Sequence, residues 1–194
     1  MEKKLFFIGP AGVGKSRLIR EVLGERLALA GGLITAPLSD DAGAFQGFAL
    51  SPAAAAGGVA GFTPALYLDC RQYPPLKDHE VFRALGVRLL EEAVWYPYAL
   101  LDELGGYELI IPEFRAALER LLAGGLPCVG ALRSAEDAEL LRSLLGLSDR
   151  YGAQHRRFLD ALRRDGDTRL FELREDNADD ARRLLERWAA EYAG

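Results

Sequence analysis

The sequence predicts an α/β fold, in which a mostly parallel sheet carries helices on both faces. A glycine-rich segment, 9–16, lies between an apolar run typical of a buried strand and an amphipathic run typical of a helix. Similar strand and helix patterns then alternate along the rest of the chain, as parallel sheets require. With 194 residues, 49% of them hydrophobic, the chain can bury a sizeable core, so we expect residues 1–194 to form a single domain.

The individual elements follow from hydrophobic periodicity. Strands are predicted at 4–8, 66–69, 97–101, 126–132 and 168–173, with shorter ones at 33–35 and 46–50. Helices are predicted at 15–30, 77–94, 112–123, 135–145, 153–164 and 178–191. In sheets of this kind ligands bind beyond the carboxyl ends of the strands, so we look for functional residues there.

The stretch 31–65 interrupts the alternation because it is rich in glycine, alanine and proline. We interpret it as a β-hairpin excursion near residues 32–66 with a loose tip. For residues 52–60 alone, a disordered linker is an equally good interpretation.

Composition narrows the function classes. The net charge of −5 gives no indication of a broad nucleic-acid or anionic membrane surface. No signal peptide or apolar stretch of membrane-spanning length is evident, so a cytoplasmic location is predicted. Cys70 and Cys128 are too few for a disulfide framework or a zinc site. His79 and His155 lack metal-ligand spacing, and we expect both at the surface.

Residues 9–16 match the phosphate-loop pattern G-x-x-x-x-G-K-[ST]. Such a turn exposes backbone N–H groups, and the following helix adds its positive dipole end, so both favour a polyphosphate. Lys15 is predicted to reach the β and γ phosphates, and the Ser16 hydroxyl to ligate Mg²⁺. The predicted nucleotide-binding residues are Gly9, Pro10, Ala11, Gly12, Val13, Gly14, Lys15, Ser16 and Arg17.

A second group of charged residues follows the apolar run 97–101. If this run is a central strand beside the first one, Asp102 lies at its carboxyl end near Ser16, where it can hold Mg²⁺ through a water molecule. Glu103 points elsewhere and is predicted to orient or deprotonate the attacking water. By itself, an apolar run before Asp-Glu is more often a solvated strand end or a helix, so the assignment depends on the phosphate loop upstream.

The segment 102–109, Asp-Glu-Leu-Gly-Gly-Tyr-Glu-Leu, resembles the D-E-[IL]-G-x-x-E motif of the small THEP1-like nucleoside triphosphatases. The resemblance extends along nearly the whole chain through the segments 9–16, 32–35, 47–48, 114–122, 127–129, 171–173 and Asn177. It implies a P-loop NTPase fold, a three-layer α/β sandwich, that hydrolyses nucleoside triphosphates with loose base preference.

The sequence also departs from that family's pattern. Pro37 stands where an acidic residue is common, and Gly106 and Tyr107 replace the usual lysine and methionine. Residues 134–156 form a longer segment than expected, and the arginines in and beside it are Arg142, Arg150, Arg156 and Arg157. These differences bear on substrate specificity more than on the fold.

Arg133 follows the predicted strand 126–132 at the same sheet edge as the phosphate loop. It is a candidate catalytic residue, an internal arginine finger for the γ-phosphate, although a solvated strand-end arginine is an equal alternative. The arginines of 133–169 form either the polar face of a helix or a lid that clamps phosphate.

We therefore expect a Mg²⁺-dependent nucleoside triphosphatase, with Lys15, Glu103 and Arg133 as catalytic residues and Ser16 and Asp102 as metal ligands. Two alternatives remain open at this point. One is a nucleotide or small-molecule kinase that uses the arginine-rich lid, and the other is a nucleotide-gated adaptor in cofactor assembly whose partner-binding loop would be 36–64. The substrate is a nucleoside triphosphate of unassigned base, because no guanine-reading Asn/Thr-Lys-x-Asp motif is evident. The sequence assigns no protein partner.

Overall fold

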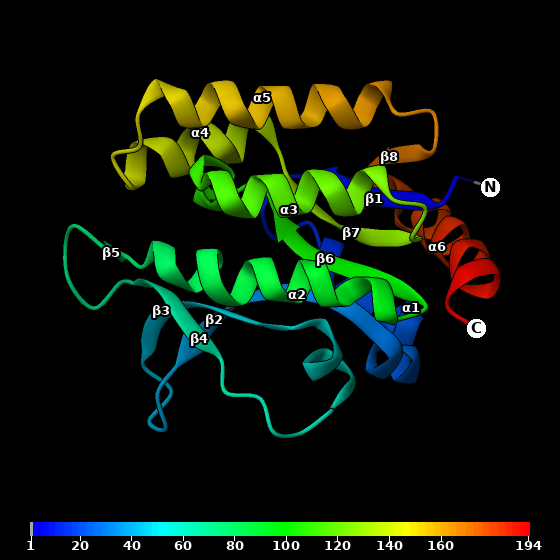
Figure 1. The fold of residues 1–194 in the computed structure, drawn as a ribbon, viewed down its shortest axis with the longest axis horizontal. Helices are drawn as coiled ribbons and strands as arrows, with labels where there is room; N and C mark the ends of the chain where they lie inside the picture. The colour runs from blue at the N-terminus through cyan, green and yellow to red at the C-terminus, as the bar shows by residue number, and fades with distance from the viewer. Residues whose placement is uncertain (1) are drawn as a thin grey trace.

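An eight-stranded sheet lies between two layers of helices in the computed structural model, which describes residues 2–194 (Figure 1). The strands are ordered β5-β4-β3-β2-β6-β7-β1-β8 across the sheet. Their bounds are β1 Lys4–Gly9, β2 Ala30–Ser39, β3 Phe45–Pro52, β4 Ala65–Asp69, β5 Leu76–Lys77, β6 Tyr98–Leu104, β7 Cys128–Arg133 and β8 Thr168–Glu172. The predicted three-layer α/β sandwich is confirmed.

Helices cover both faces of the sheet. The α-helices are α1 Lys15–Leu23, α2 Val87–Glu92, α3 Pro112–Ala123, α4 Ala135–Leu144, α5 Asp149–Arg164 and α6 Ala178–Tyr192. The short helical turns are η1 Gly24–Leu29, η2 Ala53–Gly57, the π-helical η3 Val81–Gly86, η4 Ala93–Trp95, η5 Tyr107–Ile110 and η6 Glu175–Asn177. Side chains of α1 and α6 share one core with Phe7, and those of α2, α3 and α5 share the other core with Phe6. Adjacent residues of β1 thus face opposite layers, as the strand repeat requires. None of the described helices is long and apolar enough to cross a membrane.

The five strands β2, β6, β7, β1 and β8 are parallel, so their carboxyl ends share one edge of the sheet. The prediction that the strand carrying Asp102 lies beside the first strand is wrong, because β7 lies between β6 and β1. Chain order does not fix strand order, since each helical crossover can place the next parallel strand at any free edge. Asp102 nevertheless remains at the same edge as the phosphate loop.

The excursion predicted near 32–66 begins with the antiparallel hairpin of β2 and β3, as expected. It does not leave the sheet, because β4 and β5 add to it as further antiparallel strands, as far as Lys77. The loose tip or linker expected at 52–60 is wrong for 53–57, which form η2 with Ala53 and Ala54 buried. A Cβ on Gly57 would lie 2.3 Å from the Ala28 nitrogen, so the small residues of η2 allow its backbone to lie directly against η1.

Three predicted helix boundaries also differ from the structure. The helix expected at 15–30 ends at Leu23, because Gly24 adopts a φ of 51° and the chain continues as η1. The helix expected from residue 77 gives way to the short strand β5 at its start. The helix expected from residue 153 begins earlier, at Asp149, and this extra turn brings Tyr151 onto the buried side of α5. Periodicity locates helices better than it locates their ends.

Candidate functional site

The phosphate-loop residues lie between the end of β1 and the start of α1, as the sequence predicts. Gly12 and Gly14 have φ values of 80° and 100°, which favour glycine over any side chain. Gly9 lies against the end of β8, since a Cβ there would be 2.5 Å from the Leu173 carbonyl oxygen. The loop therefore wraps the amino end of α1 and leads directly into Lys15.

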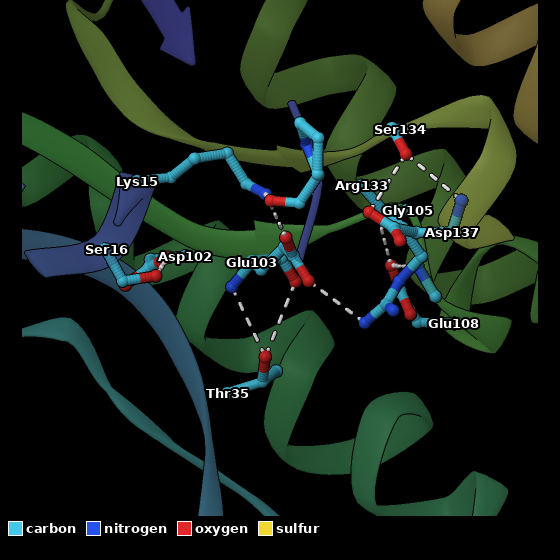
Figure 2. Close-up of polar contacts among 12 residues, drawn as sticks. Lys15, Ser16, Thr35, Asp102, Glu103, Gly105, Glu108, Arg133, Ser134 and Asp137 are labelled. Carbon is cyan, nitrogen blue, oxygen red and sulfur yellow. Dashed lines mark hydrogen bonds and ion pairs between the residues drawn. The ribbon is translucent and has the colours of Figure 1, made fainter. Parts of the chain in front are cut away.

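Lys15 is buried, and its ammonium group lies inside the loop (Figure 2). Its Nζ donates hydrogen bonds to the carbonyl oxygens of Gly9, at 2.7 Å, and Pro10, at 3.1 Å. The same Nζ lies 3.3 Å from Oε1 of Glu103. The cation is thus held in place by the loop and faces a carboxylate from β6.

Ser16 and Asp102 are in direct contact, although they come from α1 and β6. The Ser16 hydroxyl donates to Oδ1 of Asp102 at 2.6 Å, and Asp102 is only 1% exposed. Its second oxygen, Oδ2, is buried without a hydrogen-bond partner among the described residues, although Arg20 lies 3.6 Å away. Burial raises the pKa of Asp102, while the Ser16 hydroxyl and Arg20 oppose that shift.

This pair fits a Mg²⁺ ion. A hydroxyl and a buried carboxylate oxygen without a protein donor are hard oxygen ligands of the kind Mg²⁺ takes. Across residues 2–194 there is no group of three or more His, Cys, Asp and Glu that would hold a metal by itself. An ion at Ser16 and Asp102 would therefore take its other ligands from phosphate and water, as Mg²⁺ usually does.

Glu103 points away from Asp102 and lies between two cations. Its Oε1 faces Lys15, and its Oε2 lies 3.0 Å from the guanidinium NH2 of Arg133 (Figure 2). The pairing register with β7 shifts between Asp102 and Leu104. This local irregularity accompanies the separation of two neighbouring carboxylates, one toward Ser16 and one toward Lys15.

Thr35 contacts the backbone of Glu103, although the sequence analysis assigned Thr35 only to a strand. Its Oγ1 accepts a hydrogen bond from the backbone nitrogen of Glu103 at 3.2 Å. Thr35 follows Ile34, which pairs with Asp102 in the β2–β6 ladder. The hairpin strand β2 thus supports the backbone of Glu103 from the side.

Arg133 ends β7 at the predicted sheet edge, beside the phosphate loop. One guanidinium nitrogen pairs with Glu103, and its Nε is buried without a hydrogen-bond partner among the described residues. Burying a hydrogen-bond donor without an acceptor lowers the stability of the fold. The Arg133 side chain is mostly buried and paired, so it is not the freely solvated strand-end arginine of the alternative interpretation.

These residues line a cavity of about 360 Å³ at the carboxyl edge of the sheet. Its lining residues are Ala11, Gly12, Gly14, Lys15, Ser16, Arg17, Thr35, Pro37, Phe48, Tyr67, Glu103 and Arg133. Three cations and one carboxylate among them make the cavity locally positive, although the whole chain carries a net charge of −5. Such a cavity suits a polyanion.

Two further features of the cavities bear on the predictions. Phe48 and Tyr67, from β3 and β4, form an aromatic wall beside the phosphate loop that no sequence pattern predicted. Of the arginines in 133–169, only Arg133 is among the lining residues, so the alternative in which these arginines form a lid has no support from the lining of this cavity. A larger cavity of about 600 Å³ lies between α3 and α5, and none of its lining residues belongs to the loop.

Three buried polar residues lie behind the site, of which the sequence analysis misplaced His155 and did not single out Tyr151. His155 is 2% exposed, so its predicted surface position is wrong, and Tyr151 on the same helix is also buried. Glu108 is buried too, and burial raises its pKa. The helical spacing of Tyr151, His155 and Leu159 was a usable signal, since positions four apart share one face.

Comparisons with known proteins bear on the family and the fold. The family model described as NTPase matches residues 4–151 of the chain. The crystal structure of THEP1 from the hyperthermophile Aquifex aeolicus is similar in fold, with a TM-score of 0.62 and 18% sequence identity. That similarity covers 94% of this chain and 99% of the THEP1 chain. No curated protein matches the sequence.

Proposed function

This chain belongs to the NTPase family, and on that premise we propose that it is a Mg²⁺-dependent, cytoplasmic enzyme that hydrolyses nucleoside triphosphates to diphosphate and phosphate. The observation that carries the proposal is the convergence of Lys15, Glu103 and Arg133 on the phosphate-loop cavity, with contacts of 3.3 and 3.0 Å. A binding module without turnover has no need for a carboxylate held beside the phosphate site.

The triphosphate binds where backbone N–H groups and the amino end of α1 converge. Lys15 already lies in the loop, so it contacts the β and γ phosphates without a large rearrangement. The arriving phosphate competes with Glu103 for Lys15, so the Glu103 carboxylate lies beside the position that the γ-phosphate takes.

Ser16 and Asp102 would hold Mg²⁺, and the ion would neutralise charge on the phosphate oxygens. Asp102 is buried and keeps one oxygen without a hydrogen-bond donor from the described protein, so it is ready to bind the ion or its water. The Ser16–Asp102 hydrogen bond holds both groups in position beforehand.

Glu103 positions the attacking water and accepts its proton. The water oxygen forms a bond to the γ-phosphorus while the bond to the β–γ bridging oxygen breaks, and the diphosphate leaves. Arg133, next to Glu103, contacts the γ-phosphate oxygens as their charge develops. Before the substrate arrives, Glu103 is paired with both Lys15 and Arg133.

The base preference is proposed to be loose, in line with the resemblance to the THEP1-like proteins. The experiment is a panel of ATP, GTP, CTP and UTP, each with Mg²⁺ and with EDTA, in which phosphate release is measured. We expect release from all four with Mg²⁺ and none with EDTA. Full activity in EDTA, or activity with a single base, would contradict the corresponding part of the proposal.

The same panel separates the alternatives. If the diphosphate forms only when an acceptor such as a nucleoside is added to the panel, and the phosphoryl group is then found on the acceptor and not as free phosphate, the protein is a kinase and hydrolysis is not its reaction. If turnover stays very slow and rises only with a partner protein, the adaptor reading replaces the enzyme reading.

A further inference from the structure

The amino-terminal half of α5 lies behind the strand ends that carry Glu103 and Arg133. Its buried face consists of Tyr151, His155, Leu159 and Leu162, in helical spacing. The two leucines are ordinary core residues, whereas Tyr151 and His155 carry polar atoms into a buried place. Buried polar atoms are retained where they find partners, so the partners show what this face does.

Tyr151 binds the segment that follows Glu103. Its hydroxyl donates a buried hydrogen bond of 2.7 Å to the carbonyl oxygen of Gly105, two residues after Glu103. The nitrogens of Gly105 and Gly106 donate to Oε1 of Glu108, each at 2.8 Å. Both backbone groups of Gly105 are therefore bound, the carbonyl by Tyr151 of α5 and the nitrogen by the buried Glu108 carboxylate.

His155, one turn further along α5, binds the other charged residue. Its Nε2 lies 3.2 Å from the carbonyl oxygen of Arg133. A carbonyl only accepts, so Nε2 carries the proton and donates it. Burial lowers the pKa of His155, which keeps the ring in this neutral form.

Gly105 closes the contact between these two parts. A Cβ on Gly105 would lie 3.0 Å from the Arg133 Cβ and 3.2 Å from Nε2 of His155, and its φ is 106°. A side chain at this position would crowd Arg133 and His155 and would strain the backbone, because its φ is positive. The segment after Glu103, the end of β7 and α5 thus form one tightly packed unit.

We propose that Tyr151 and His155 are positioning residues that hold Glu103 and Arg133 in their mutual geometry. The two charged side chains come from neighbouring strands, β6 and β7, and their contact of 3.0 Å depends on where each strand ends. Tyr151 holds Gly105, which follows β6, and His155 holds Arg133, the last residue of β7. The proposal rests on the proposed roles of Glu103 and Arg133 in hydrolysis.

The first test is Tyr151→Phe, which removes one hydroxyl and leaves the ring. We expect kcat to fall about 10-fold while the affinity for Mg²⁺–nucleotide stays unchanged, because a small displacement of catalytic groups affects the transition state most. The matched control is Tyr98→Phe, since the buried Tyr98 hydroxyl also donates to a backbone carbonyl, that of Arg26, at 2.9 Å. Tyr98 begins β6, at the end opposite Glu103.

The second test compares two substitutions at His155. His155→Leu removes the donor and should lower kcat about as much as Tyr151→Phe, whereas His155→Gln places a donor near the same carbonyl and should restore most of the rate. A role limited to core packing would give the opposite order, because leucine is the better core residue. If kcat is unchanged in both Tyr151→Phe and His155→Leu, or equally reduced in Tyr98→Phe, the proposal is overturned.

A third arm separates this inference from the proposed function. In a Glu103→Gln background, Tyr151→Phe should cause little further loss, because the group it positions is already disabled. If Glu103→Gln turns over at the wild-type rate while Tyr151→Phe and His155→Leu are slow, the role proposed for Glu103 is wrong and α5 acts through Arg133. If Glu103→Gln is slow and the α5 variants are not, the positioning role alone fails.

Discussion

The phosphate loop and the Glu103–Arg133 pair lie in one cavity, but the chain builds them in different ways. The loop is local: Lys15 bonds to Gly9, six residues away, within one strand–turn–helix unit. The charged pair joins two strands, and its support reaches from Gly105 to Tyr151, 46 residues away. The difference suggests that nucleotide affinity depends on local sequence, whereas turnover depends on tertiary packing.

The largest expected effect tests the Glu103–Arg133 pair, the region that depends on tertiary packing. Glu103→Gln should lower the turnover rate about 10²- to 10⁴-fold, the usual contribution of a positioned general base, and leave nucleotide and Mg²⁺ affinity intact. Single-turnover hydrolysis and calorimetric titration of the same protein measure the two quantities. Wild-type turnover would make Glu103 a structural carboxylate, and the attacking water would have to be positioned by another group.

The next largest effect tests the phosphate loop, the region built from local sequence. Lys15→Ala should weaken triphosphate binding by about 30- to 1,000-fold, or about 2–4 kcal/mol, because a charge-assisted contact to a buried anion is lost. Lys77→Ala is a matched control, since Lys77 also donates to a backbone carbonyl, that of Leu145, but lies outside the cavity lining. Equal affinity in wild type and Lys15→Ala would rule out the phosphate-loop assignment.

A smaller effect is expected at Asp102, which lies on the same strand as Glu103 and contacts Ser16 beside the phosphate loop. Asp102→Asn should raise the Mg²⁺ concentration needed for half-maximal hydrolysis by about 10-fold, because a neutral carbonyl attracts the ion or its water less strongly than a carboxylate does. A magnesium titration of the hydrolysis rate measures it, with nucleotide held constant. An unchanged magnesium requirement would remove Asp102 from the metal site.

The smallest effect is on stability and concerns an ion pair away from both the phosphate loop and the Glu103–Arg133 pair. Lys4 donates to Asp165 at 2.6 Å, and this contact, with smaller help from Thr168, lowers the pKa of Asp165 from 3.8 to about 2. Because the folded-state pKa is lowered, the contact stabilises the protein above about pH 4 and is lost as the pH falls toward 2.

Asp165→Asn should therefore reduce the free energy of unfolding at pH 7 by about 0.5–1 kcal/mol, a value that allows for solvent screening of a partly exposed pair. The difference from wild type should shrink to a small fraction of this value at pH 2, and hydrolysis at pH 7 should be unaffected. Urea unfolding at both pH values measures the first effect. A difference that persists undiminished at pH 2 would mean that the ion pair is not its source.

Much of the architecture could be predicted from the sequence, and the errors have physical reasons. The alternation of strands and helices predicted the layers, because periodicity reports which face of each element is buried. It gave the wrong neighbour for the strand that carries Asp102, since strand order depends on the crossovers. It also missed that 53–57 pack as η2 against η1, which depends on a close backbone approach between distant segments.

The phosphate loop, and the edge of the sheet on which Asp102, Glu103 and Arg133 lie, could be predicted from the sequence alone. These follow from consecutive residues and from the shared edge of parallel strands. The residues that support the charged pair, Tyr151 and His155, could be identified only from the packing of α5 against the ends of β6 and β7, as could the Ser16–Asp102 hydrogen bond. A buried hydroxyl or imidazole finds its partner through packing between elements far apart in the chain, and no local pattern encodes that partner.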